Sequence, residues 1–99
     1  MRMILKATIP VEAGNDAIKA GRLGAVMERI LGDLKPEASY FYAEKGRRHA
    51  MVVFDLKDTS DIPRVVEPFF LEFNAEVEIQ PCMNVDDLRV AMSKLSQGV

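Results

Sequence analysis

The residues best suited to chemistry lie in one short stretch, which runs from Tyr40 to Phe54 and reads YFYAEKGRRHAMVVF. His49 is the only histidine of the chain, and histidine is the side chain whose unperturbed pKa lies nearest neutrality. Beside Tyr40 and Tyr42 it could act as a general base while a tyrosine orients a substrate, provided that these rings share one face of a sheet. The alternative is a histidine at the end of a strand, near a solvated turn, without a catalytic role.

The loop around Gly46 decides where the tyrosines point, because a slip of one residue moves every side chain of a strand to the other face. A three-residue loop pairs Phe41 with His49 and sends both tyrosines to the helix side. A two- or four-residue loop pairs Tyr42 with His49. The two-residue loop places Lys45 in the left-handed region at about 1–2 kcal/mol, whereas two buried hydroxyls without partners cost about 1–3 kcal/mol each. A four-residue loop avoids the strain at Lys45. We therefore expect both tyrosines on the face of His49, through a loop of two or four residues.

The elements that position this stretch follow from the spacing of apolar residues. Alternation predicts four strands, at residues 3–9, 38–44, 47–58 and 75–81. Helical spacing predicts three helices, at residues 15–34, 59–73 and 84–95. Gly21 predicts a kink or break in the first helix, and Pro68 predicts a kink or restart in the second. Thr59 or Ser60 is expected to cap the second helix, and Asn84 the third.

This order of elements predicts one α+β domain over residues 1–99, with an antiparallel sheet and helices on one face. Right-handed crossovers place the first and third strands in the centre. The face of the sheet opposite the first two helices is called the far face below. Strand three carries apolar residues in both of its rows, Val52 and Phe54 in one, Met51 and Val53 in the other. A strand that is apolar on both sides is normally covered on both, so we expect a second subunit or the last helix on the far face.

A homodimer that pairs two far faces would enclose a cavity lined by Lys6, Met51, Val53, Asp55 and Glu78. Concave, mostly apolar sites with a few polar groups are typical of small-molecule pockets. The alternative is that Lys6 only pairs across strands with Asp55 or Glu78, a contact worth about 0.2–1 kcal/mol.

Composition excludes several classes of function. A net charge of −2 disfavours nucleic acid as a partner, because binding the phosphate backbone needs a concentrated positive face. No apolar run approaches the roughly 20 residues of a membrane span, so no membrane partner is expected. Cys82 is the only cysteine, which favours packing in a reducing, cytoplasmic setting over a disulfide framework. One histidine and one cysteine do not make a standard zinc site, and no cofactor motif is present.

Three stretches, KPEASYF, VEPFFLEFNAEVEIQP and MNVDDL, resemble those of a family of short bacterial proteins of uncharacterised function. The resemblance extends over most of the chain and implies a ferredoxin-like fold of the dimeric α+β barrel group. That wider group includes cofactor-independent monooxygenases, haem-degrading enzymes, muconolactone isomerases and proteins with no known reaction. Its monooxygenases often use tryptophan with asparagine and histidine, whereas this chain has no tryptophan.

Three functions fit this architecture. The first is a homodimer or larger homo-oligomer that binds a small aromatic or anionic molecule between the sheet and its partner. Its pocket would be lined by Lys6, Tyr40, Tyr42, His49, Asp55 and Glu78. The second is a monooxygenase or isomerase with His49 as base and Tyr42 orienting the substrate. The third is a structural or regulatory module whose far face is only a subunit interface.

Overall fold

Four antiparallel strands form one sheet in the computed structural model of the protein, which describes residues 1–98. They are β1 (Arg2–Ile9), β2 (Ala38–Glu44), β3 (Arg47–Asp55) and β4 (Glu76–Pro81). Their order across the sheet is β2-β3-β1-β4, which confirms the prediction that the first and third strands are central. The third strand ends at Asp55, earlier than predicted. Val99, the last residue of the predicted domain, lies outside the described residues.

The first helical segment is divided into α1 (Val11–Lys19) and α2 (Leu23–Leu34). Gly21 lies between them with a φ of 69°, a left-handed conformation that glycine adopts without strain, so the predicted break is confirmed. The predicted start at Asn15 is wrong. The helix begins directly after Pro10, whose carbonyl accepts a helical hydrogen bond.

The second predicted helix opens with a short 3₁₀ turn, η1 (Thr59–Asp61), and continues as α3 (Ile62–Phe73). The carboxylate of Asp58 caps the turn by accepting the N–H of Ser60. A hydroxyl cap at Thr59 or Ser60 is therefore a wrong prediction. The acid one position earlier is an equally good acceptor and already has an extended backbone.

Pro68 lies inside α3, and the helix continues past it to Phe73, so of the predicted kink or restart the restart does not occur. Proline has no N–H to donate to the carbonyl of Arg64. Arg64 is an exposed residue, so water can donate a hydrogen bond to that carbonyl instead. Val65, Phe69 and Phe73 form the buried side of the helix. Packing of these side chains against the sheet holds the helix together across the proline.

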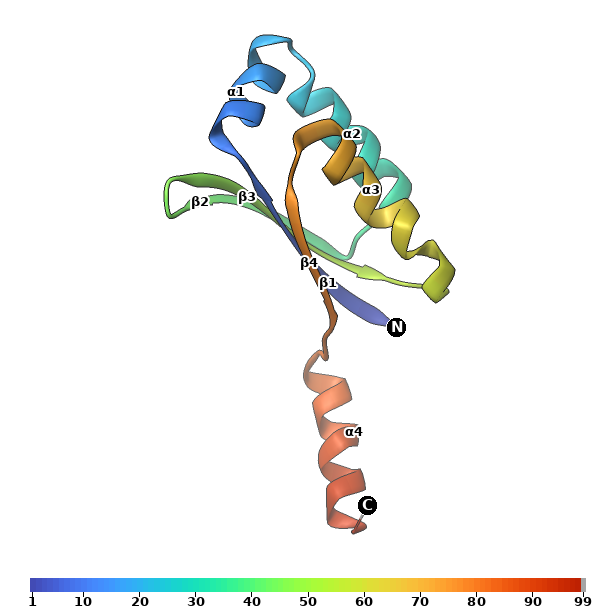
Figure 1. Cartoon of the computed structure of the whole chain (residues 1–99). Coiled ribbons are helices and arrows are strands. Elements are labelled where there is room, and N and C mark those ends of the chain that lie inside the picture. The colour runs from blue at the N-terminus through green and yellow to red at the C-terminus, as the bar shows by residue number, and fades with distance from the viewer. Residues whose placement is uncertain (99) are drawn as a thin grey trace.

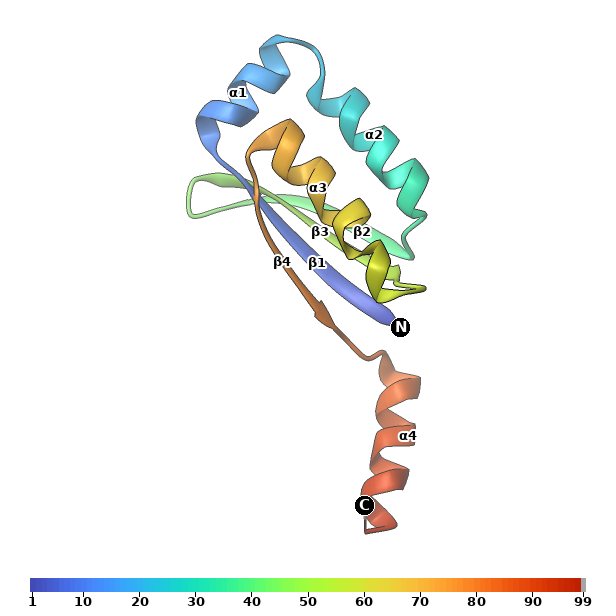
Figure 2. The same ribbon diagram turned by 45° about the vertical axis from the view of Figure 1, so that its right-hand side comes forward.

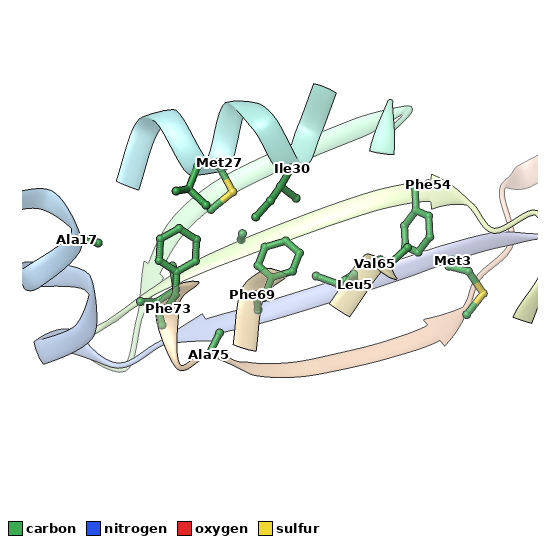
Figure 3. Close-up of a cluster of buried hydrophobic side chains, with 14 of the residues drawn as sticks. Met3, Leu5, Ala17, Met27, Ile30, Phe54, Val65, Phe69, Phe73 and Ala75 are labelled. Atoms are coloured by element: carbon green, nitrogen blue, oxygen red, sulfur yellow. The ribbon is translucent and has the colours of Figure 1, made fainter. Parts of the chain in front are cut away.

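The core fills the space between the helices and one face of the sheet (Figure 3). Phe69 and Phe73 of α3 meet the inner rows of the two central strands, where every second residue is buried. These rows consist of Met3, Leu5, Ala7 and Ile9 on β1 and Ala50, Val52 and Phe54 on β3. The predicted alternation of these strands is confirmed, and it places the remaining residues of both strands on the far face.

The hairpin of β2 and β3 is closed by a two-residue turn. Tyr42 pairs with His49, which confirms the predicted register, and Lys45 and Gly46 form the turn. Their φ values are 53° and 74°, the two left-handed residues of a type I′ turn. Of the two loop lengths that allow this register, the chain therefore has the shorter one. The twist of a type I′ turn matches that of the flanking strands, and this match outweighs the strain at Lys45.

The last helix, α4 (Val85–Ser96), extends away from the rest of the molecule beyond the end of β4 (Figures 1 and 2). As predicted, Asn84 caps it: its side chain accepts the N–H of Asp87, and the Asp87 carboxylate accepts the N–H of Asn84. All residues of α4 are described and none is buried. Of the two covers expected for the far face, the last helix of the same chain is therefore wrong, and a second subunit stays a prediction.

Helices α1, α2 and α3 lie together on one face of the sheet in both views (Figures 1 and 2). The architecture is thus an α+β, ferredoxin-like fold with four antiparallel strands and an additional C-terminal helix. Within residues 1–98, no helix covers the far face. That face is where the predicted site residues lie.

Candidate functional site

The far face is organised in rows that cross all four strands. Two rows are largely polar and hold most of the predicted site residues. In the order β2, β3, β1, β4, the first row is Tyr42, His49, Thr8 and Glu76. The second row, in the same order, is Tyr40, Met51, Lys6 and Glu78. The strand pairing therefore brings together the histidine, both tyrosines and a lysine that are distant in sequence.

A hollow with a volume of ≈ 370 Å³ lies over these two rows. Its lining consists of Lys6, Thr8, Tyr42, Glu44, His49, Met51, Glu76 and Glu78. Lys6, Tyr42, His49 and Glu78 were predicted for one site and do line this hollow. The volume is at the lower end of the range for small-molecule pockets, roughly 300–1,000 Å³.

His49 is held by neighbours on three sides. Its Nε2 lies 3.0 Å from the carbonyl oxygen of Glu44, and its Nδ1 lies 3.1 Å from the hydroxyl oxygen of Thr8. The ring also stacks on Tyr42, with centroids 5.1 Å apart and planes inclined by 11°. A carbonyl oxygen can only accept, so Nε2 carries a proton, and in the neutral ring Nδ1 accepts from Thr8. Neither nitrogen has a lone pair free to take a proton from a substrate, and this geometry fits a structural histidine.

The charges of the hollow are unbalanced. Three carboxylates, of Glu44, Glu76 and Glu78, face one ammonium group, that of Lys6. Among the described residues none of these four groups forms an ion pair within 4.0 Å. The cross-strand ion pair expected between Lys6 and Glu78 or Asp55 is therefore absent from this part of the chain. The hollow carries a net negative charge, which favours a cation over an anion.

Three predicted residues lie on the far face but outside the hollow, namely Tyr40, Val53 and Asp55. Tyr40 is 62% exposed and extends the second row toward the edge of the sheet. Asp55 lies at the end of β3, opposite Arg2, and its carboxylate pairs with Lys57 and with the amino group of Met1. Hydrogen bonds from these two cations lower the pKa of Asp55 to about 2. The carboxylate is thus engaged in local ion pairs away from His49.

Sequence reasoning missed a second concavity, a groove of ≈ 760 Å³ between α2 and α3 at the end of β3. Its floor is apolar and includes Ile30, Phe54 and Val65. Charged residues form its rim, and several are already paired, for example Arg64 with Asp61. No local pattern could have indicated this groove, because its walls come from segments far apart in the sequence.

Cys82 is a free, partly buried thiol directly after β4. Within residues 1–98 there is no group of three or more histidine, cysteine, aspartate or glutamate side chains arranged to hold a metal ion. None of the helices in the described residues has the length and apolar character needed to cross a membrane.

No family model matches the sequence, and no curated protein matches it. Among solved structures, the chain is similar to a formyltetrahydrofolate deformylase from Pseudomonas putida KT2440, with a TM-score of 0.54 and 17% sequence identity. The match covers 83% of this chain and 29% of that chain. At this identity the likeness supports the fold alone. It agrees with the fold implied by the family resemblance of the sequence and does not assign the chain to a family.

Proposed function

We propose that this protein is a self-associating regulatory or structural module, and that copies assemble through the far face of the sheet. The observation that carries this proposal is an apolar patch at the centre of that face. Met51, Val53 and Ile4 lie on the two central strands, yet each remains partly exposed. An antiparallel sheet that faces water normally has polar residues there, so an apolar patch favours a face that is covered in the assembly.

The fold supports a regulatory role, because the chain resembles an ACT-like α+β domain, which is a type of regulatory domain. The chain spans 29% of the deformylase that it matches, and the activity of that longer protein is not part of this proposal. The engaged nitrogens of His49 also favour assembly over acid–base catalysis as the work of this face.

Charge introduced at the centre of the far face tests the proposal. In the wild-type chain we expect a homodimer by light scattering coupled to size-exclusion chromatography. Val53→Lys places an ammonium group in this apolar patch and is expected to give folded monomers, because an unpaired charge is costly to bury in an interface. Phe41→Lys is the matched control, since Phe41 is an exposed apolar residue of the same hairpin on the opposite face of the sheet. A monomeric wild-type chain would refute the proposal.

The hollow supports a second candidate, the binding of a small molecule between the sheet and the partner subunit. Its unpaired carboxylates favour a cation with an aromatic or apolar body, in place of the anionic ligand first considered. The probe is benzylammonium, with benzoate as a control of equal size and opposite charge. We expect benzylammonium alone to shift the ring resonances of Tyr42 and His49 in NMR spectra. The Glu78→Gln variant should weaken this effect, and equal shifts with both probes would contradict the proposed charge selectivity.

A further inference from the structure

Helix α4 carries an apolar stripe with nothing packed on it. Leu88, Met92 and Leu95 recur at steps of four and three, the spacing of one helix face, and are 43%, 49% and 63% exposed. Val85 continues the stripe at the start of the helix. An isolated helix of twelve residues is marginal in water, and most helices in proteins are stabilised by packing of such a face. The stripe therefore requires a partner surface.

The size of the molecule also indicates a missing partner. Its radius of gyration is 16.0 Å, whereas a compact chain of this length has about 13 Å. Its accessible surface is 6734 Å², whereas a compact monomer of 11.1 kDa exposes about 5,700 Å². The difference of roughly 1,000 Å² per chain is close to the roughly 800 Å² that each partner buries in a standard interface.

The far face offers an unpartnered apolar surface whose dimensions match those of α4. Its apolar half is defined as Ile4, Ala38, Tyr40, Met51 and Val53, which lie on the neighbouring strands β2, β3 and β1. Three neighbouring strands are about 10 Å wide from first to last. A helix is about 10 Å in diameter, and one of twelve residues is about 18 Å long. One helix thus covers the apolar half and leaves the acidic end of the hollow open at its side.

The geometry of the linker directs α4 away from its own sheet. The N–H of Cys82 donates to the carbonyl of Arg2 at 3.1 Å, which prolongs the pairing of β4 with β1. Arg2 also holds the start of α4, with its Nη1 2.8 Å from Oδ2 of Asp87. Only Met83 and Asn84 separate these anchored segments. In both views α4 continues beyond the end of β4 instead of turning back (Figures 1 and 2).

We propose that α4 is exchanged between two copies of this chain, and that each copy places its apolar stripe on the apolar half of the other's far face. This inference rests on the proposed self-association and names the segment that performs it. The exchange is reciprocal, so both stripes and both apolar halves are covered in a closed dimer. No apolar surface of this set remains to recruit a third copy.

The first experiment places charge on the two sides of α4. Leu88→Glu/Met92→Glu puts carboxylates in the stripe, whereas Val90→Glu changes an apolar residue of similar exposure, 55%, on the opposite side of the helix. By light scattering we expect monomers for the double variant and dimers for Val90→Glu, with unchanged thermal unfolding of the sheet. A double variant that stays dimeric while Val53→Lys is monomeric would overturn the exchange and leave the proposed function standing. A wild-type monomer would overturn both.

A second experiment separates exchange from pairing of like surfaces. The Leu88→Glu/Met92→Glu chain keeps an intact far face, and the Val53→Lys chain keeps an intact α4. When they are mixed, the intact helix of one fits the intact face of the other, so native mass spectrometry should detect a heterodimer. If sheets packed on sheets, or helices on helices, every heterodimer would contain a damaged surface at its only contact. Failure to form the heterodimer at the highest concentration would therefore overturn the exchange.

Discussion

The two faces of β3 have similar side chains and different surroundings. Val52 and Phe54 are fully buried under the helices, whereas Met51 and Val53 on the far face remain partly exposed. Burying an apolar side chain of this size is worth about 1.5–3 kcal/mol. On the inner face that gain stabilises the fold of one chain. On the far face it is still available for association with a second chain.

The largest expected effect contrasts neighbours on opposite faces. Phe54→Ala removes a 1% exposed ring from the core, and we expect a loss of about 3–5 kcal/mol in the free energy of unfolding. Val53→Ala is the matched control, and in a dissociated sample it should cost less than about 1 kcal/mol because its site is already partly solvated. Urea denaturation at low protein concentration measures both. Equal losses would show that the far face is packed within a single chain.

The next effect concerns the contacts of His49 on the far face. His49→Ala removes two hydrogen bonds and the stack on Tyr42, and we expect a loss of about 1–2 kcal/mol because the site is partly solvated. Tyr40→Ala, which removes an exposed ring from the same face, serves as the control with a smaller loss. Thermal unfolding of both variants gives the comparison. No change for His49→Ala would mean that these contacts do not stabilise the hairpin.

The turn determines which residues belong to which face, and it is strained at one position. Lys45→Asn keeps the two-residue turn and introduces a residue that tolerates positive φ, so we expect a gain of up to about 1 kcal/mol. Gly46→Ala at φ 74° should have the opposite sign. Denaturant midpoints measure both changes. A loss of stability in Lys45→Asn would indicate that the lysine side chain makes a contribution larger than its backbone strain.

The smallest effect concerns the end of the far face at Asp55. Its pKa of about 2 is below the ordinary value of 3.8, so its ion pairs stabilise the fold above about pH 4. This contribution is lost as the pH falls through 2. Asp55→Asn should therefore be slightly less stable than wild type at pH 5, and the two should converge near pH 2. A constant difference in melting temperature across this range would contradict the assignment to Asp55.

Local signals predicted most of the elements and which of the candidate residues share the far face. Alternation on β1 and β3 predicted the buried rows, and the preference against burying tyrosine hydroxyls predicted that Tyr42 faces the side of His49. The turn type could not be predicted, because the strain at Lys45 is local and the twist that offsets it belongs to the whole hairpin. The early start of α1 could not be predicted either, because Pro10 ends a strand as readily as it precedes a helix.

Features that depend on contacts between residues distant in sequence could not be predicted from local patterns. Asp55 shares a face with His49 by alternation, but its position at the strand end and its pairing with Lys57 depend on the loop that follows. The covering of the far face was predicted from one premise, that an apolar surface is covered by its own chain or by a partner. This premise does not say which of the two covers it. The direction of α4 depends on the contact of Arg2 with Asp87, which no periodicity encodes.

The shortness of the linker at Met83 and Asn84 has a consequence for the proposed assembly. A helix tethered to its own sheet by a longer, flexible linker would meet that sheet at an effective concentration in the millimolar range. Closure within one chain would then compete successfully with a partner at lower protein concentrations. A few glycine and serine residues inserted after Met83 would convert an exchanged dimer into a self-closed monomer without changing a residue of either contact surface. Linker length, in this view, determines the number of chains.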